Sequence, residues 1–449
     1  MARIRTPKPH PLRAPSALAL AALLVTSCAS GDGDGHGGGS DDARPAGTAT
    51  PRPHGYVEGA KEAAEQQARL ILNEPGTGET RVLDLLTGKV TRTARTKGAL
   101  RLGTDGRFGY LHTSRATHVL DSGSWLVDHG DHVHYYRAEI RDVGALPGKA
   151  ADEVRSDAAV TAAVGKDGRA VLYDRTALDK GTITSTRILP GSYEGAVVPY
   201  SEHLLALERP TGKEDTDTAE LVVLDRDGEQ LDTPDGARTC ARPQGDAVTR
   251  RGVVFGCAEG ALLVQENSGE RGGEKSGKEG GAFTAEMIPY PGKVPATERA
   301  TVFRHRAGSD TLTAAAGPRA VWVLDVGERT WTRVRTGTVV AANTAGEGAP
   351  LLVLESDGAL HGYDITTGEQ TGRTKQLTRL RTGTRTGTGT HTGTGTGTGT
   401  PVIEVDRSRA YVNDPHGRRV HEVDYNDALR VARSFDLDIE PVLMAETGR

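Results

Sequence analysis

The chain has 449 residues, a formal net charge of −5 and only 4% aromatic residues. Residues 1–27 carry four basic and no acidic groups, so the rest of the chain is near −9. This charge argues against nucleic acid as a partner and against a basic membrane-binding patch. The apolar run Ala17–Val25 has only 9 residues, too few to cross a bilayer, and no other segment is long and apolar enough.

The N-terminus predicts a secretory signal, because a basic region precedes the short apolar run. The run ends in Val25-Thr26-Ser27-Cys28, which is similar to a bacterial lipobox. We therefore expect a lipoprotein signal peptide over residues 1–27, cleavage before Cys28 and a lipid on its sulfur. The protein would then be exported and held on the outer face of the cell membrane by its lipid anchor only. The alternative is an ordinary signal peptide with an incidental cysteine.

Residues 28–57 consist mainly of Gly, Ser, Asp, Pro and Thr and predict a flexible tether. Asp32, Asp34 and His36 could bind a cation weakly there, although such residues more often only keep a linker solvated. The following stretch, Glu58–Arg69, is expected to form one short helix.

From there to residue 449 one pattern recurs: an alternating apolar strand, an acidic residue and a turn containing Gly. Eight such phrases follow one another at steps of 37 to 60 residues, and their acidic positions are Asp84, Asp121, Asp174, Asp225, Glu266, Asp325, Asp364 and Asp424. Steps near 40 match one four-stranded propeller blade. The sequence thus predicts an all-β protein, a β-propeller over residues 58–449 with eight blades. Seven blades is the alternative if the first and last phrases belong to one blade built from both termini. A large β-sandwich or a β-helix is the remaining alternative.

Long steps contain insertions, and one of them is a nearly pure Gly-Thr repeat at residues 382–400. This tract has no apolar residues to bury, so we expect a disordered loop within the last blade.

Another insertion, Asp128–Tyr136, contains three of the 14 His residues of the chain. Imidazole and carboxylate together suit Zn²⁺. In an extended segment Asp128, His132 and His134 would share a face. The alternative is a hydrogen-bonded surface turn without a metal.

Further ligands for this site come from the same region. A turn at Gly130 would let His129 or Asp131 join the face, and His118 lies just upstream. A histidine within a strand is, however, more often structural than a ligand.

Cys240 and Cys257 remain once Cys28 is lipidated. Two remaining cysteines in an exported protein predict a disulfide between them.

Three motifs stand out when they are taken together. The first runs from Asp121-Ser122-Gly123-Ser124-Trp125 into Asp128–Tyr136; the others are Gly252–Gly260 with Cys240 upstream, and Tyr411-Val412-Asn413-Asp414-Pro415. Together they resemble those of the AztD-type zinc metallochaperones. The resemblance covers roughly residues 70–435 and implies an extracytoplasmic β-propeller. It further implies that the His/Asp stretch binds Zn²⁺ and that the protein hands it to the solute-binding protein of a zinc ABC importer. A mobile N-terminal segment, here around Asp32, Asp34 and His36, would help the transfer.

The chain also departs from the family pattern. Glu194 and Gln244 stand where that pattern has His, and Glu153 is a third candidate loss. Glutamine is a poor zinc ligand, so these departures count against a second, weaker site and weaken the case for the main one.

Three functions compete on this sequence. We expect a zinc-binding metallochaperone or zinc buffer, and not an enzyme. A metal-free lipoprotein propeller that binds a protein or another ligand is the main alternative. A propeller lactonase or glycan-cleaving enzyme is less favoured, because Asn343 and Asn413 lack a compelling partner pattern.

Overall fold

The structure is a computed structural model that describes residues 57–129, 132–210, 217–231, 234–267, 283–380 and 400–449. The predicted signal peptide with Cys28, the tether with Asp32, Asp34 and His36, the residue Asp131 and nearly all of the Gly-Thr tract lie outside these ranges. All described strands fall in the unit Arg52–Arg449. Among the described residues there is no helix with the length and hydrophobicity needed to span a membrane.

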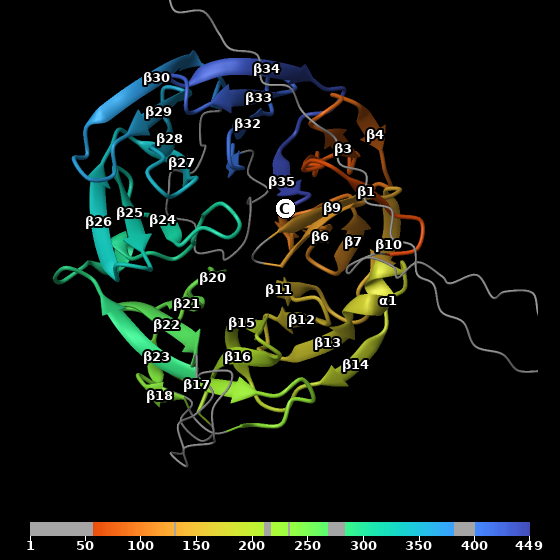
Figure 1. Cartoon of the computed structure of the whole chain (residues 1–449), viewed down its shortest axis with the longest axis vertical. Helices are drawn as coiled ribbons and strands as arrows, with labels where there is room; N and C mark the ends of the chain where they lie inside the picture. Colours follow the sequence, from red (N-terminus) through yellow and green to blue (C-terminus); the bar gives the residue numbers. More distant parts are fainter. Residues whose placement is uncertain (1–56, 130–131, 211–216, 232–233, 268–282, 381–399) are drawn as a thin grey trace, which may run out of the picture. The chain divides into compact units, whose positions relative to one another are not determined.

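The described strands form nine sheets, and eight of them follow one another around a centre (Figure 1). The strands of each sheet are given from the centre outward. The first sheet contains β35 (Leu443–Thr447), β2 (Arg69–Asn73), β3 (Thr80–Asp84) and β4 (Val90–Arg92), and the second contains β5 (Arg101–Thr104), β6 (Phe108–His112), β7 (Thr117–Asp121) and β10 (Arg141–Ala145). The third contains β11 (Ala151–Ser156), β12 (Val160–Gly165), β13 (Ala170–Asp174) and β14 (Ser185–Ile188), and the fourth contains β15 (Tyr193–Tyr200), β16 (His203–Glu208), β17 (Thr218–Leu224) and β19 (Thr239–Ala241). The fifth sheet contains β20 (Asp246–Val248), β21 (Val253–Gly256), β22 (Gly260–Glu266) and β23 (Phe283–Pro289) with β18 (Asp235–Gly236), and the sixth contains β24 (Thr311–Ala315), β25 (Ala320–Asp325) and β26 (Thr330–Arg335). The seventh contains β27 (Val339–Thr344), β28 (Leu351–Glu355), β29 (Ala359–Tyr363) and β30 (Gln370–Gln376), and the eighth contains β31 (Ile403–Val405), β32 (Ala410–Asp414), β33 (Arg419–Asp424) and β34 (Arg430–Asp436).

The ninth sheet stands apart from this series. It contains β1 (Lys61–Ala63), β9 (Val133–Arg137) and β8 (Ser124–Asp128), in that order. The described helices are short: α1 (Arg175–Asp179) and a 3-10 turn at Ala296–Glu298.

This arrangement confirms the all-β class and the β-propeller. The prediction of eight blades rests on the eight phrases of the sequence and stays a prediction. One of the eight sheets around the centre is built from both ends of the chain, because β35 pairs with β2. The short helix expected over Glu58–Arg69 is wrong: this stretch contains β1 and the first residue of β2. Its Ala, Glu and Gln favour a helix locally, but strand pairing outweighs that preference.

Each repeated phrase marks the same place in its sheet, the third strand from the centre. These strands are β3, β7, β13, β17, β22, β25, β29 and β33; in the sheet of β25, an isolated bridge between Arg304 and Thr313 stands in place of the innermost strand. In the seven phrases that have Asp, this residue has a local role, because its carboxylate accepts a backbone N–H group of the turn that follows. Asp84 accepts from Thr87, and Asp325 accepts from Glu328, each at 2.9 Å. Short Asp side chains favour turns in this way.

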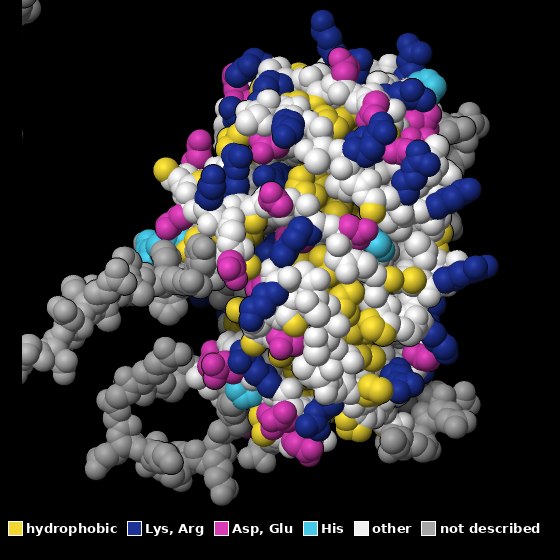
Figure 2. All heavy atoms as spheres, turned by 90° about the vertical axis from the view of Figure 1, so that its right-hand side faces the viewer, with side chains coloured by type: hydrophobic (Ala, Val, Ile, Leu, Met, Phe, Trp, Pro, Cys, Tyr) yellow, Lys and Arg dark blue, Asp and Glu magenta, His cyan; other side chains and the backbone are white. Residues whose placement is uncertain are grey.

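The core lies between neighbouring sheets, where apolar faces meet. Leu205 of β16 packs in one buried cluster with Phe255 of β21 and Leu262 of β22. On the face shown in Figure 2, acidic and basic side chains are interspersed around small apolar areas.

Candidate metal centre

The His/Asp stretch forms the tip of a hairpin inserted between β7 and β10. Its strands, β8 and β9, are antiparallel, and Val127 faces His134 while Asp128 faces Val133. The turn closes with a hydrogen bond from the His129 N–H to the His132 carbonyl, 2.9 Å long. The predicted insertion in this step of the repeat is therefore a separate hairpin with its own turn.

Three imidazoles meet at this tip. The nearest ligand atoms of His129, His132 and His134 all lie within 4.8 Å of one another. The ring centroids of His132 and His134 are 4.8 Å apart, and those of His129 and His132 are 4.9 Å apart. His129 and His132 are exposed and His134 is half-buried. This cluster could hold a metal ion, because neutral imidazole is a common metal ligand.

The other predicted ligands are placed differently. Asp128 is exposed at the end of β8 and is not part of the three-histidine group. His118 lies on β7, where its Nε2 is 2.5 Å from Oδ1 of Asp142 on β10. We expected Asp128, His132 and His134 to share one face. The register places Asp128 opposite Val133 and His134 opposite Val127, so Asp128 and His134 lie on different faces of the hairpin. The cluster contains His129 in place of Asp128.

The three residues that we expected to replace His of the family pattern make ion pairs or lie at the surface. Glu194 pairs with Arg209, and Gln244 is exposed. Glu153 is buried, with its carboxylate 3.1 Å from Arg155. The described residues contain no second group of three or more potential metal-binding side chains.

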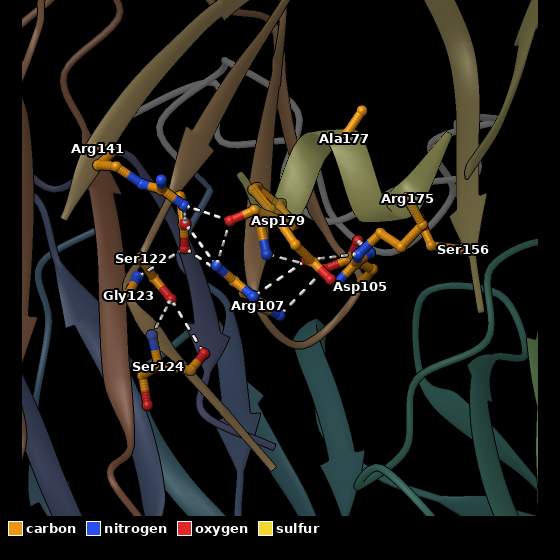
Figure 3. A network of polar contacts seen from close by, with 12 residues as sticks. Asp105, Arg107, Ser122, Gly123, Ser124, Arg141, Ser156, Arg175, Ala177 and Asp179 are labelled. Atoms are coloured by element: carbon orange, nitrogen blue, oxygen red, sulfur yellow. Dashed lines mark hydrogen bonds and ion pairs between the residues drawn. The ribbon is translucent and has the colours of Figure 1, made fainter. Parts of the chain in front are cut away.

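The base of the hairpin is fixed by a buried ion-pair network (Figure 3). Asp121 is fully buried and accepts from Nε and Nη2 of Arg107 at 3.1 and 2.9 Å and from Arg141 at 2.8 Å. It also accepts the N–H of Gly123, at the start of the hairpin. A buried charge is stable only when it is paired in this way.

The guanidinium of Arg107 also contacts Trp125, the first aromatic residue of the hairpin. The Arg107 carbon Cζ lies 3.8 Å from the centroid of the Trp125 ring, and that ring stacks on Tyr136 at 5.5 Å. A cation over an aromatic face is attracted by the ring's electrons. The strands that carry the histidines are therefore anchored to the propeller through Trp125 and Tyr136.

Further carboxylates extend this network toward α1. Burial raises the pKa of Asp179, and the nearby Arg175 and Arg107 only partly offset this effect. Burial would also raise the pKa of Asp105, but Arg175, Tyr110 and backbone N–H groups outweigh it, so that pKa is lowered. These groups support the hairpin base and lie outside the histidine cluster.

One residue at the site was not predicted from the sequence. The carboxylate Oε1 of Glu62, on β1, is 2.7 Å from Nδ1 of His134. Glu62 lies in the stretch assigned to a helix, and its neighbours Lys61 and Ala63 carry no pattern that indicates a site. Only the pairing of β1 with β9 brings it there.

Away from the hairpin, Cys240 and Cys257 form the predicted disulfide, with Cα atoms 5.2 Å apart. It joins β19 of one sheet to the residue after β21 in the next.

Comparison with known proteins gives a likeness of fold. No protein-family model matches the chain, and no curated protein matches it. The crystal structure of AztD from Citrobacter koseri aligns over 85% of this chain and 98% of that chain, with a TM-score of 0.65 and 18% identity. The structure of apo AztD from the same organism aligns over the same shares, with a TM-score of 0.63 and 16% identity. The chain therefore has an AztD-like β-propeller fold.

Proposed function

We propose that this protein is an extracytoplasmic zinc-binding metallochaperone or zinc buffer that delivers Zn²⁺ to the solute-binding protein of a zinc ABC importer. The observation that carries the proposal is the meeting of His129, His132 and His134 at one hairpin tip. The AztD-like fold and the resemblance of the Asp128–Tyr136 motif to zinc metallochaperones support it.

The donor set fits Zn²⁺ as cargo. Two nitrogen atoms bound to one tetrahedral Zn²⁺ are roughly 3.3 Å apart, given Zn–N bonds of about 2.0 Å. Small side-chain rotations would bring the three imidazoles, now within 4.8 Å, to that spacing. Three protein ligands leave one position open for water or for a ligand of a receiving protein.

The exposure of the tip suits transfer rather than storage. Because His129 and His132 are exposed, an acceptor could add its own ligand at the open position before these imidazoles leave. We propose no catalytic role for the site. The lipid on Cys28 would keep the protein at the membrane, and Asp32, Asp34 and His36 in the tether would assist transfer. A buried disulfide agrees with export to an oxidising compartment.

A zinc titration of the untagged protein against a zinc-sensitive dye tests the proposal. We expect about one tightly bound Zn²⁺ in the wild type. The double substitution His132→Ala and His134→Ala should abolish tight binding. His416→Ala is the matched control, because this exposed histidine lies in the turn between β32 and β33 and outside the cluster. His118→Ala should likewise leave affinity nearly unchanged, and a large loss would make His118 a ligand.

Two results would overturn the proposal. Absence of zinc binding in the wild type would favour the metal-free binding module, and equal affinity in the double variant would move the site elsewhere. Transfer to the acceptor is tested separately by deleting residues 32–42. This deletion should slow transfer more than it weakens equilibrium binding.

A further inference from the structure

The segment that precedes the propeller contributes a strand to the histidine hairpin. Strand β1 pairs with β9 and has no other partner strand in the described part of the chain. In this pairing Glu62 faces Tyr136, and Ala63 faces Tyr135. The same segment packs Ala60 against the aromatic pair of Trp125 and Tyr136. A three-residue edge strand is therefore held on the hairpin by pairing and by a small apolar cluster.

The strand places a carboxylate against one metal-binding imidazole. Glu62 Oε1 lies 2.7 Å from His134 Nδ1, and the side chains of these residues are 45% and 25% exposed. The Glu62 carboxylate also contributes, after burial, to the raised pKa of Tyr136. An ionised carboxylate only accepts hydrogen bonds, so Nδ1 of His134 must carry the proton. Its Nε2 then keeps the lone pair that a metal ion needs.

From this geometry we infer that Glu62 is a positioning residue for the metal centre: it fixes the tautomer and ring orientation of His134, so that Nε2 is presented to the ion. A carboxylate behind a ligating histidine also makes that histidine a stronger donor. Because Glu62 comes from β1, the pairing of β1 with β9 influences how tightly the site binds the metal ion. The inference rests on the proposed function for its zinc part, whereas the tautomer of His134 does not depend on zinc.

Two substitutions separate positioning from direct ligation. Removal of such a supporting group typically weakens metal binding by about 10- to 100-fold, and we expect this loss for Glu62→Ala. In Glu62→Gln the amide oxygen can still accept the N–H of His134, so the loss should be smaller. Glutamine is a poor zinc ligand, so a directly ligating Glu62 would give equal losses in both variants. Glu58→Gln is the control, because it removes the same charge from an exposed position on the same segment.

Nitrogen-15 NMR of the histidine side chains, recorded without zinc, provides the second measurement. We expect the Nδ1–H form of His134 to dominate in the wild type and in Glu58→Gln, and to lose that dominance in Glu62→Ala. Hydrogen exchange of the β1 backbone amides shows whether this strand remains paired with β9 in each variant.

The outcomes distinguish the inference from the proposed function. If the wild type binds zinc and Glu62→Ala binds it equally well, or if the His134 tautomer is unchanged in that variant, the inference is wrong and the proposed function stands. If the wild type binds no zinc, the proposed function fails, and the role of Glu62 in metal binding fails with it.

Discussion

Leu70 on β2 and Glu446 on β35 face each other in an antiparallel pair, although they come from opposite ends of the chain. Both are fully buried. Neither carboxylate oxygen of Glu446 has a hydrogen-bond partner among the described residues, and its nearest cation is Arg449, 3.8 Å away. The strand that closes the ring thus buries an acidic side chain that has only a weak electrostatic partner.

This burial predicts a dependence of stability on pH. Burial raises the pKa of Glu446 to about 8, despite Arg449. An unfolded chain releases this proton near pH 4.3. Between these values the folded state binds the extra proton, so its stability falls as pH rises. Glu446→Gln mimics the protonated acid and should raise the melting temperature at pH 9, with little effect at pH 5.

Thermal unfolding at both pH values checks this expectation. Glu369→Gln is the control, because Glu369 is exposed in a turn and should show no such dependence. A melting temperature of Glu446→Gln that parallels the wild type from pH 5 to 9 would contradict the assignment of a raised pKa.

The hairpin base gives a second prediction. Asp121→Asn removes the charge that pairs with buried Arg107, and among the described residues this leaves Asp179 as the remaining ion-pair partner of that guanidinium. Breaking a buried pair in this way costs about 3–5 kcal/mol. We expect a large drop in melting temperature and weaker zinc binding, because the strands that carry the histidines lose their anchor.

Asp84→Asn is the matched control for this change. Asp84 holds the same position in the first repeat, but its side chain is 18% exposed and its contact to Arg69 is 3.7 Å long. Its loss should cost only about 1 kcal/mol. Equal destabilisation by the two substitutions would show that the network in Figure 3 gives the hairpin no special support.

The sequence predicts the fold well because its signals are local. An alternating strand followed by an acidic residue and a turn identifies the third strand of each of the eight sheets around the centre, and each phrase can be read without knowledge of its partners. Strand β35 is different: its partner β2 lies at the other end of the chain.

The site is predicted in part for the same reason. His129, His132 and His134 lie close together in sequence, so one tight turn brings them together. Which of the His and Asp side chains lie together depends on the register of the hairpin, and that register places Asp128 opposite Val133. Glu62 is 72 positions from His134 and reaches it only through β1, so no local pattern could indicate it.

Lipid anchoring at Cys28 stays a prediction from the sequence motif. Cys28→Ser should release the protein from the membrane fraction of fractionated cells into the soluble fraction. Alanine at Ser30, just after the motif, is a control that should leave the distribution unchanged. Sedimentation of the Cys28→Ser protein with membranes would mean that the motif is not a lipobox.

The disulfide predicts a defined loss of stability. Cys240 and Cys257 are buried and close a loop with a sequence separation of 17 residues. In the chain-entropy model a loop of this size contributes about 3 kcal/mol, because it restricts the unfolded chain. The double substitution Cys240→Ala and Cys257→Ala keeps small apolar groups in the cluster around Phe255 and should lower the melting temperature by several degrees. Reduction of the wild type should lower it similarly, whereas reductant should not affect the double variant. If reduction and the double substitution both leave the melting temperature unchanged, the bond does not stabilise the fold, and packing alone holds these two sheets together.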